Sequence, residues 1–256
     1  MLHLSDLKKV LLGLPMAIIM NAYCLNKADG SLDITLNQLY LTSFFDVQRQ
    51  ADGSGRLVVT FMSMAGILFF SIICGMEIYK ECSTTGVYTL VRVEKRKTWF
   101  AKLIARLLEM VLMYSLLYSI VTLVLHLHYT GEKINIHTVP VLFFSVWYLF
   151  YMVSVISLVI NFASMWKNTM VGCFSGTLVL ILMISCSLFF NDIPVIKEYP
   201  NLWYLNPINM INLYQNIGIQ GYIGYMLYYS VLLFGAIFIV VGMTDKLDVG
   251  IFKEQV

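Results

Sequence analysis

Long apolar runs separated by short polar segments are the dominant pattern along this chain. The hydrocarbon core of a bilayer is about 30 Å thick and needs about 20 apolar residues per helical crossing, so runs of that length indicate membrane spans. Uncharged runs of this kind occupy residues 57–76, 110–131, 134–166 and 168–191. A further run at residues 221–242 follows a stretch that is rich in Asn, Gln and Pro.

The first apolar run, residues 10–25, is shorter and contains Pro15 and Asn21. It allows two interpretations: a first membrane span, or the h-region of a signal peptide that follows Lys8 and Lys9. No small-residue cleavage site follows it cleanly. If the run is retained, it makes six spans, which we place at approximately residues 10–26, 57–76, 103–128, 138–164, 169–190 and 221–243.

The composition supports an all-α integral membrane protein, with residues 1–256 forming one transmembrane domain. Apolar residues make up 59% of the chain and charged residues only 12%, and the mean hydropathy is +0.77. These values lie well outside the usual range of soluble domains. The polar residues 200–220 would leave amides without partners in lipid if they crossed fully, so we expect re-entrant or interfacial helices between spans five and six.

The distribution of basic residues sets the expected orientation. Loops rich in Lys and Arg face the cytoplasm. With the amino terminus inside, 12 of the 17 basic residues lie on the cytoplasmic side and 5 on the outer side. We therefore expect both termini in the cytoplasm.

Residues 77–100, between spans two and three, form the loop with the most charge. Glu77 and Glu81 are four residues apart on one helical face, Gly86 would interrupt the helix, and residues 87–93 are largely apolar. A basic cluster then precedes Trp99. Two interpretations remain: a plain membrane anchor, or a short helix that presents Tyr88, Leu90 and Val91 to another protein while basic residues bind lipid phosphates. The anchor residues would be Lys95, Arg96, Lys97, Trp99 and Lys102.

With Glu81, Gly86, Leu90, Lys95 or Arg96, and Lys102 in this order, the chain resembles the permease subunits of type-2 ATP-binding-cassette exporters. The resemblance covers nearly the whole chain, since Asn206 and Pro207 between spans five and six are similar to the Asn-Pro of the outer re-entrant helices in that family. An Asn cap followed by Pro in a first turn also gives a physical reason for a helix to begin there.

The resemblance implies a cytoplasmic coupling helix that docks on a separate ATPase. The docking residues would be Glu81, Gly86, Tyr88, Leu90, Val91 and Arg92. The resemblance also implies an outer gate at Asn206 and Pro207. ATP and Mg²⁺ would bind to the partner ATPase, and this chain would bind no cofactor itself. A second permease protomer, the same chain or a homologous one, would complete the transporter in a bacterial plasma membrane.

The chain carries no common signature of an enzyme active site. It lacks the phosphate-binding loop G-x-x-x-x-G-K-[ST], the zinc motif H-E-x-x-H and the serine elbow G-x-S-x-G, so we expect a transport subunit without its own ATPase site. The cysteines lack C-x-x-C spacing and are expected to be buried apolar residues. We expect no metal site, although His126, His128 and His137 lie near one another in the sequence.

Polar residues inside the spans are the remaining candidates. Arg106 and Glu109 are three residues apart and form a possible intramembrane pair. Ser154, Ser157 and Asn161 are expected to form hydrogen bonds between helices.

The cargo follows mainly from the resemblance, which favours small exporters of amphipathic, toxin-like or antimicrobial peptides. The Met-rich and aromatic spans suit such cargo. Lipid-like or drug-like molecules are alternative cargoes. A membrane immunity or scaffold protein that only binds is an alternative of another class. We expect no nucleic acid partner, and no span carries the polar ring of an ion channel.

Overall fold

The computed structural model describes residues 4–28, 54–83, 96–131, 133–134, 138–190 and 205–243. Every regular element in these ranges is a helix: α1 (Leu4–Ala28), α3 (Ser54–Cys74), α4 (Glu77–Glu81), α6 (Arg96–Thr130), α7 (Thr138–Trp166), α8 (Thr169–Phe190), η2 (Pro207–Asn209) and α11 (Met210–Met243). The expected all-helical fold is therefore present in the described part of the chain.

Four helices in this part are long and apolar enough to cross a membrane. They comprise Arg96–Thr130, Thr138–Trp166, Thr169–Ser187 and Ile223–Gly242. The helices α1 and α3 coincide with the other two predicted spans. The chain thus has the character of a helical membrane protein, while the count of six spans stays a prediction.

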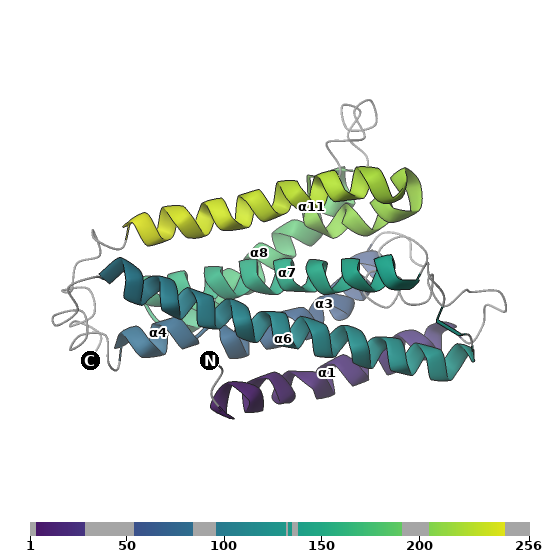
Figure 1. Ribbon diagram of the computed structural model, residues 1–256, viewed down its shortest axis with the longest axis horizontal. Coiled ribbons are helices and arrows are strands. Elements are labelled where there is room, and N and C mark those ends of the chain that lie inside the picture. Colours follow the sequence, from purple (N-terminus) through teal and green to yellow (C-terminus); the bar gives the residue numbers. More distant parts are fainter. Residues whose placement is uncertain are drawn as a thin grey trace.

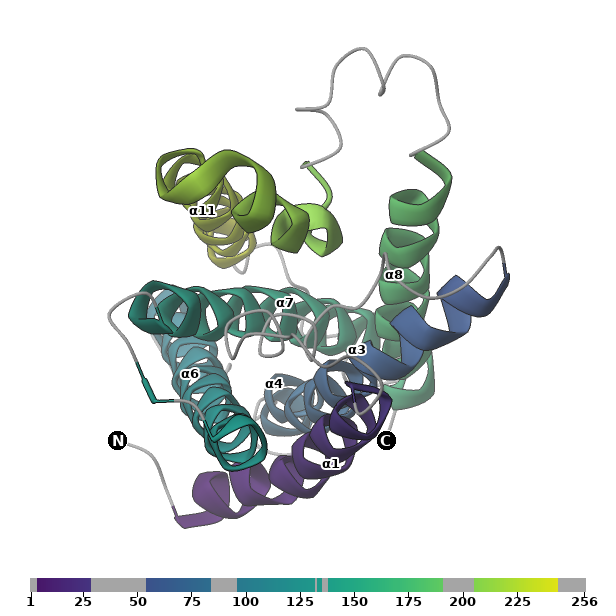
Figure 2. The ribbon, with the colours of Figure 1, turned by 90° about the vertical axis from the view of Figure 1, so that its right-hand side faces the viewer.

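The long helices run alternately in opposite directions along the bundle (Figure 1). Helix α7 occupies the centre, where it contacts α3, α4, α6, α8 and α11. Figure 2 shows α11 on the far side of α7 from α1. Because α7 contacts α3, α6, α8 and α11, its position fixes most of the packing in the bundle.

Close packing of α7 and α8 depends on small residues. Gly172 and Gly176 form a G-x-x-x-G pattern on α8, which lets helix backbones approach closely in membranes. A Cβ atom at Gly172 would lie 2.6 Å from the backbone oxygen of Ile160 and would overlap the hydroxyl of Ser164. Asn168 caps the start of α8, since its Oδ1 accepts a hydrogen bond of 2.9 Å from the backbone N–H of Val171.

A second contact region joins α1, α3 and α6. The rings of Phe70 and Tyr114 stack with centroids 3.7 Å apart, and Gly13 on α1 leaves room for both rings. Asn21 on α1 is buried and donates a hydrogen bond of 2.9 Å to the hydroxyl of Thr122 on α6. A polar bond of this kind between helices holds their register in an apolar surrounding.

The starts of three helices differ from the sequence prediction. Helix α11 begins at Met210 and not near residue 221, because a helix satisfies its own backbone groups even where its side chains are polar. The third and the first spans also start earlier than expected. The helix of the third span was expected to begin near residue 103, but α6 begins at Arg96, so Arg96, Lys97, Trp99 and Lys102 all lie in its first turns. The first helix extends from Leu4 rather than from residue 10. The physical reason is the same in both cases: helices continue beyond the apolar run, because charged residues are good helix formers when their ends reach water.

The region between spans five and six contains a short 3-10 turn followed by a long helix. Pro207 begins η2, and α11 follows at Met210. Figure 2 shows the first turns of α11 crossing the end of the bundle before the helix follows the long axis. A re-entrant arrangement in a membrane stays a prediction.

Replacing Gly172 by Ala should destabilise the bundle, because the added methyl group collides with the backbone of Ile160. Overpacking of this kind costs about 1–3 kcal/mol. The matched control is Gly235→Ala on α11, where no atom lies within 4 Å of the added Cβ. The free energy of unfolding in mixed micelles, measured by detergent titration, should fall for Gly172→Ala and not for Gly235→Ala. Equal effects of the two substitutions would contradict the close packing of α7 on α8.

Candidate functional site

The candidate site lies where the second span gives way to α4. Helix α3 ends at Cys74, and Gly75 and Met76 form a turn before α4 begins at Glu77. A Cβ atom at Gly75 would lie 2.6 Å from the side chain of Ile160 on α7. Only glycine therefore allows the turn to lie this close to the central helix.

Asn161 on α7 holds the start of α4 in place. Its side-chain oxygen accepts hydrogen bonds from the backbone N–H groups of Ile78, at 2.9 Å, and Tyr79, at 3.2 Å. Its side-chain nitrogen donates a bond of 2.9 Å to the backbone oxygen of Ser157. The first N–H groups of a helix lack partners within it, so Asn161 satisfies from a neighbouring helix what a cap residue would satisfy locally.

A group of charged residues connects α4 with α1 and α6. We call this group the ion cluster, and its members are Asp6 and Lys9 on α1, Glu77 and Glu81 on α4, and Arg106 on α6. The guanidinium of Arg106 donates two hydrogen bonds to the carboxylate of Asp6, at 2.7 and 3.0 Å. Such a two-pronged contact is the strongest geometry for an Arg–carboxylate pair.

The cluster also includes contacts to both carboxylates of α4. The ammonium of Lys9 donates a hydrogen bond of 2.5 Å to Glu77. The third guanidinium nitrogen of Arg106 lies 3.6 Å from the carboxylate of Glu81. Each end of the five-residue helix α4 is therefore tied to a different neighbouring helix.

Burial decreases across the cluster. The Asp6 side chain is fully buried, those of Lys9 and Arg106 are about one quarter exposed, and that of Glu81 is 40% exposed. A buried carboxylate without a partner costs several kcal/mol, so the pairing with Arg106 is what makes the position of Asp6 tolerable.

The cluster shows no preparation for acid–base or metal chemistry. Its carboxylates are engaged with cations, and the part of the chain described here contains no group of three or more His, Cys, Asp and Glu residues that could hold a metal ion. Burial, followed by the charge of Glu81, raises the pKa of the Cys82 thiol to about 12. A thiol with a raised pKa is a poor nucleophile at neutral pH. The contacts join α4 to three other helices: α1, α6 and α7.

The structure brings together only some of the predicted site residues. Glu81 and Arg106 meet in the ion cluster. Lys97 and Lys102 are exposed, and Trp99 is partly buried, on the first turns of α6. The other predicted docking and anchor residues lie outside the described residues: Gly86, Tyr88, Leu90, Val91, Arg92 and Lys95.

Arg106 has partners on other helices that the sequence analysis did not name. Glu109 lies three residues later on α6 with an exposed side chain, and its role with Arg106 as a functional pair stays a prediction. Asp6 was missed as a site residue. It is the only acidic residue among the first 28. A single carboxylate beside an apolar run was the sequence feature that could have marked Asp6 as a site residue.

Asn206 forms the local cap that its position before a proline indicates. Its Oδ1 accepts a hydrogen bond of 3.2 Å from the N–H of Ile208, and its Nδ2 donates one of 2.7 Å to the backbone oxygen of Met183 on α8. Pro207 is buried. Asn206 therefore attaches η2 to α8. The role of Asn206 and Pro207 as an outer gate stays a prediction.

Comparison of the chain with protein families, with curated proteins and with solved structures gives no match.

Arg106→Gln should destabilise the protein by about 2–4 kcal/mol, because it leaves the buried carboxylate of Asp6 without its main partner. The double variant Asp6→Asn with Arg106→Gln should recover much of that loss, since both charges are gone. Lys102→Gln, an exposed cation one turn earlier on the same helix, is the control and should change stability by less than about 0.5 kcal/mol. Unfolding in mixed micelles followed by circular dichroism measures all three. A double variant that is as unstable as Arg106→Gln alone would show that Asp6 and Arg106 are not a coupled pair.

Proposed function

We propose that this chain is the membrane subunit of an exporter that is powered by a separate ATP-binding-cassette ATPase. The observation that carries the proposal is the attachment of α4 by the ion cluster and Asn161. Helix α4 leads directly into the charged segment that resembles a coupling helix. A short element held to α1, α6 and α7 suits the task of passing movement from a docked motor into the bundle.

In this proposal, ATP and Mg²⁺ bind only to the partner ATPase. Two membrane subunits face each other, and each rests on one ATPase subunit through its coupling segment. When ATP binding closes the ATPase pair, the coupling segments move toward each other. The force reaches α4 first and passes through Glu77 and Glu81 to α1 and α6, because charged pairs in an apolar surrounding resist separation.

The same proposal sets the orientation of the bundle across the membrane. The ends of α1 and α6 that carry Asp6 and Arg106 face the cytoplasm, with both termini on that side, in agreement with the distribution of basic residues. The membrane is the plasma membrane of a bacterium. Asn206 and Pro207 lie toward the outer side, where movement of η2 against α8 opens the path for cargo.

The proposed cargo is an amphipathic peptide of the toxin or antimicrobial type. The support is chemical and comes from the walls of the bundle. The spans are rich in Met, Phe and Tyr, and flexible, polarizable Met side chains adapt to varied apolar partners. The chain itself performs no covalent chemistry in this scheme.

Replacing Gly86 or Leu90 by Asp should abolish association with the ATPase, because a carboxylate at an apolar docking surface must lose its hydration without gaining a partner. The matched control is Ile134→Asp, an exposed apolar residue beyond the opposite end of α6. Copurification of the ATPase with the tagged membrane subunit, after expression of both genes, is the measurement. Membrane insertion should be equal in all variants.

Two results would overturn the proposal. One is unchanged association in Gly86→Asp and Leu90→Asp. The other is transport of peptide by the purified chain in vesicles that contain no ATPase. Binding of peptide without any transport, even with the ATPase present, would favour the alternative of an immunity or scaffold protein.

A further inference from the structure

Among the side chains that the structure describes, those of α11 contact α6 and α7 at fewer places than those of α8 contact α7. The main attachment is aromatic: the rings of Tyr151 on α7 and Tyr229 on α11 have centroids 5.0 Å apart. Next to them, the indole N–H of Trp147 donates a hydrogen bond of 3.3 Å to the hydroxyl of Ser230. Figure 2 shows the ribbon of α11 set apart from the other helices. This loose attachment leaves space on either side of the aromatic contact.

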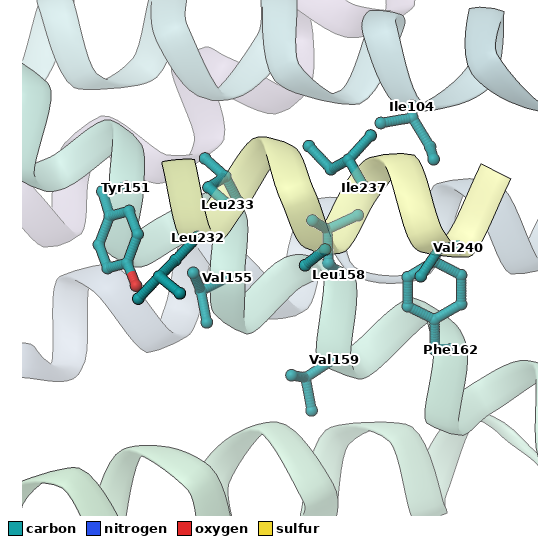
Figure 3. A pocket seen from close by; sticks show the side chains of 11 residues that line it. Ile104, Tyr151, Val155, Leu158, Val159, Phe162, Leu232, Leu233, Ile237 and Val240 are labelled. Carbon is teal, nitrogen blue, oxygen red and sulfur yellow. The ribbon is translucent and has the colours of Figure 1, made fainter. Parts of the chain in front are cut away.

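Two cavities occupy that space, and they share Tyr151 and Leu233. The first has a volume of about 280 Å³ and lies between α6, α7 and α11 (Figure 3). The second, of about 330 Å³, lies beside Trp147 and Phe143. Both volumes are far above the roughly 10–15 Å³ that accommodates one water molecule. We call the first of them the α11 cavity.

The lining of the α11 cavity is hydrocarbon. Its residues are aliphatic or aromatic, among them Ile104 on α6, Val155 and Phe162 on α7, and Leu232 and Val240 on α11, and the hydroxyl of Tyr151 is the one polar side-chain group. No charged residue takes part. An apolar cavity of this kind does not hold water, because water needs two to four polar partners.

The position of the cavity places it within the membrane. All its lining residues belong to the helices that are long and apolar enough to span. Ile104 lies near the start of α6, whereas Phe162 and Val240 lie near the ends of α7 and α11, so the cavity occupies the half of the bundle that contains the ion cluster. Leu232 lines the cavity and is also 46% exposed. Leu232 therefore belongs both to the wall of the cavity and to the outer surface of the bundle.

We propose that the α11 cavity binds one acyl chain of a phospholipid from the leaflet on the ion-cluster side. An acyl chain needs no hydrogen bonds, and it is the abundant molecule at this depth. A peptide segment fits less well, since each backbone amide in an apolar site without partners costs several kcal/mol. The wall supplies only the hydroxyl of Tyr151.

An exposed basic residue, Lys97, lies nearer the end of α6 than the cavity does. Lys97 precedes Ile104 by seven residues, so the two residues share one face of α6 and are separated by about 10 Å along its axis. Cations at the membrane surface attract anionic lipids, so the site should prefer phosphatidylglycerol to phosphatidylcholine. This inference does not depend on the proposed transport function.

The test uses vesicles of phosphatidylglycerol with a photoreactive diazirine near the end of one acyl chain. After illumination, mass spectrometry locates the labelled residues of the full chain. We expect the lining segments of α7 and α11 to be labelled several-fold more than the exposed face of α8 around Phe174, which is 68% exposed. Equal labelling of the two surfaces would overturn the proposal, and this comparison needs no variant.

A variant pair tests the cavity itself. Ala236→Phe, at a lining position, should fill the cavity and lower the labelling of α7 several-fold. Ala105→Phe, at an exposed alanine on α6 that does not line the cavity, should leave the labelling unchanged. Undiminished labelling in Ala236→Phe would contradict the site. Displacement of the lipid label by an added amphipathic peptide would identify the cavity as a peptide site and would also overturn the proposal.

Discussion

A buried carboxylate in an apolar helix bundle is tolerable only when a cation meets it with good geometry, and the pair formed by Asp6 and Arg106 satisfies this requirement. The rest of the site depends on that pair. With Arg106 turned toward Asp6, a further nitrogen of the same guanidinium reaches Glu81, and Lys9 on the same helix as Asp6 reaches Glu77. Helix α4 is too short to be stable alone. It derives its position from these charges and from Asn161.

The bundle divides into a tightly packed part and a loosely attached helix. Glycines bring α8 and the turn before α4 against α7, and buried polar bonds fix α1 on α6. Helix α11, in contrast, places Tyr229 and Leu233 in the core and has cavities beside them. This division suits a transporter in which one part transmits force and another part exchanges contacts with lipid or cargo. The division of the bundle into these two parts follows from the size and polarity of the side chains at each helix contact.

The positions of the long helices could be predicted from the sequence, because each requires an uncharged run of membrane length. The ends of the helices could not be predicted, because charged residues such as Arg96 and Lys97 can continue a helix as readily as they can end one. The ion cluster could not be predicted from the hydrophobic pattern either, because Asp6 and Arg106 are 100 residues apart and no local spacing connects them. The packing role of Gly75 could not be predicted for the same reason, because its neighbour Ile160 belongs to another helix. The G-x-x-x-G pattern on α8 was readable from the sequence and marks a real contact with α7.

In the proposed function, α4 would move as one body with α6 when a partner ATPase binds ATP. The direct measurement is the distance between spin labels at Lys80 on α4 and Tyr129 near the far end of α6, both exposed, by pulsed electron paramagnetic resonance on the reconstituted complex. The account predicts the same distance with and without ATP, while the distance between the two Lys80 labels of a subunit pair shortens when ATP binds. A change in the distance from Lys80 to Tyr129 that accompanies ATP binding would contradict it.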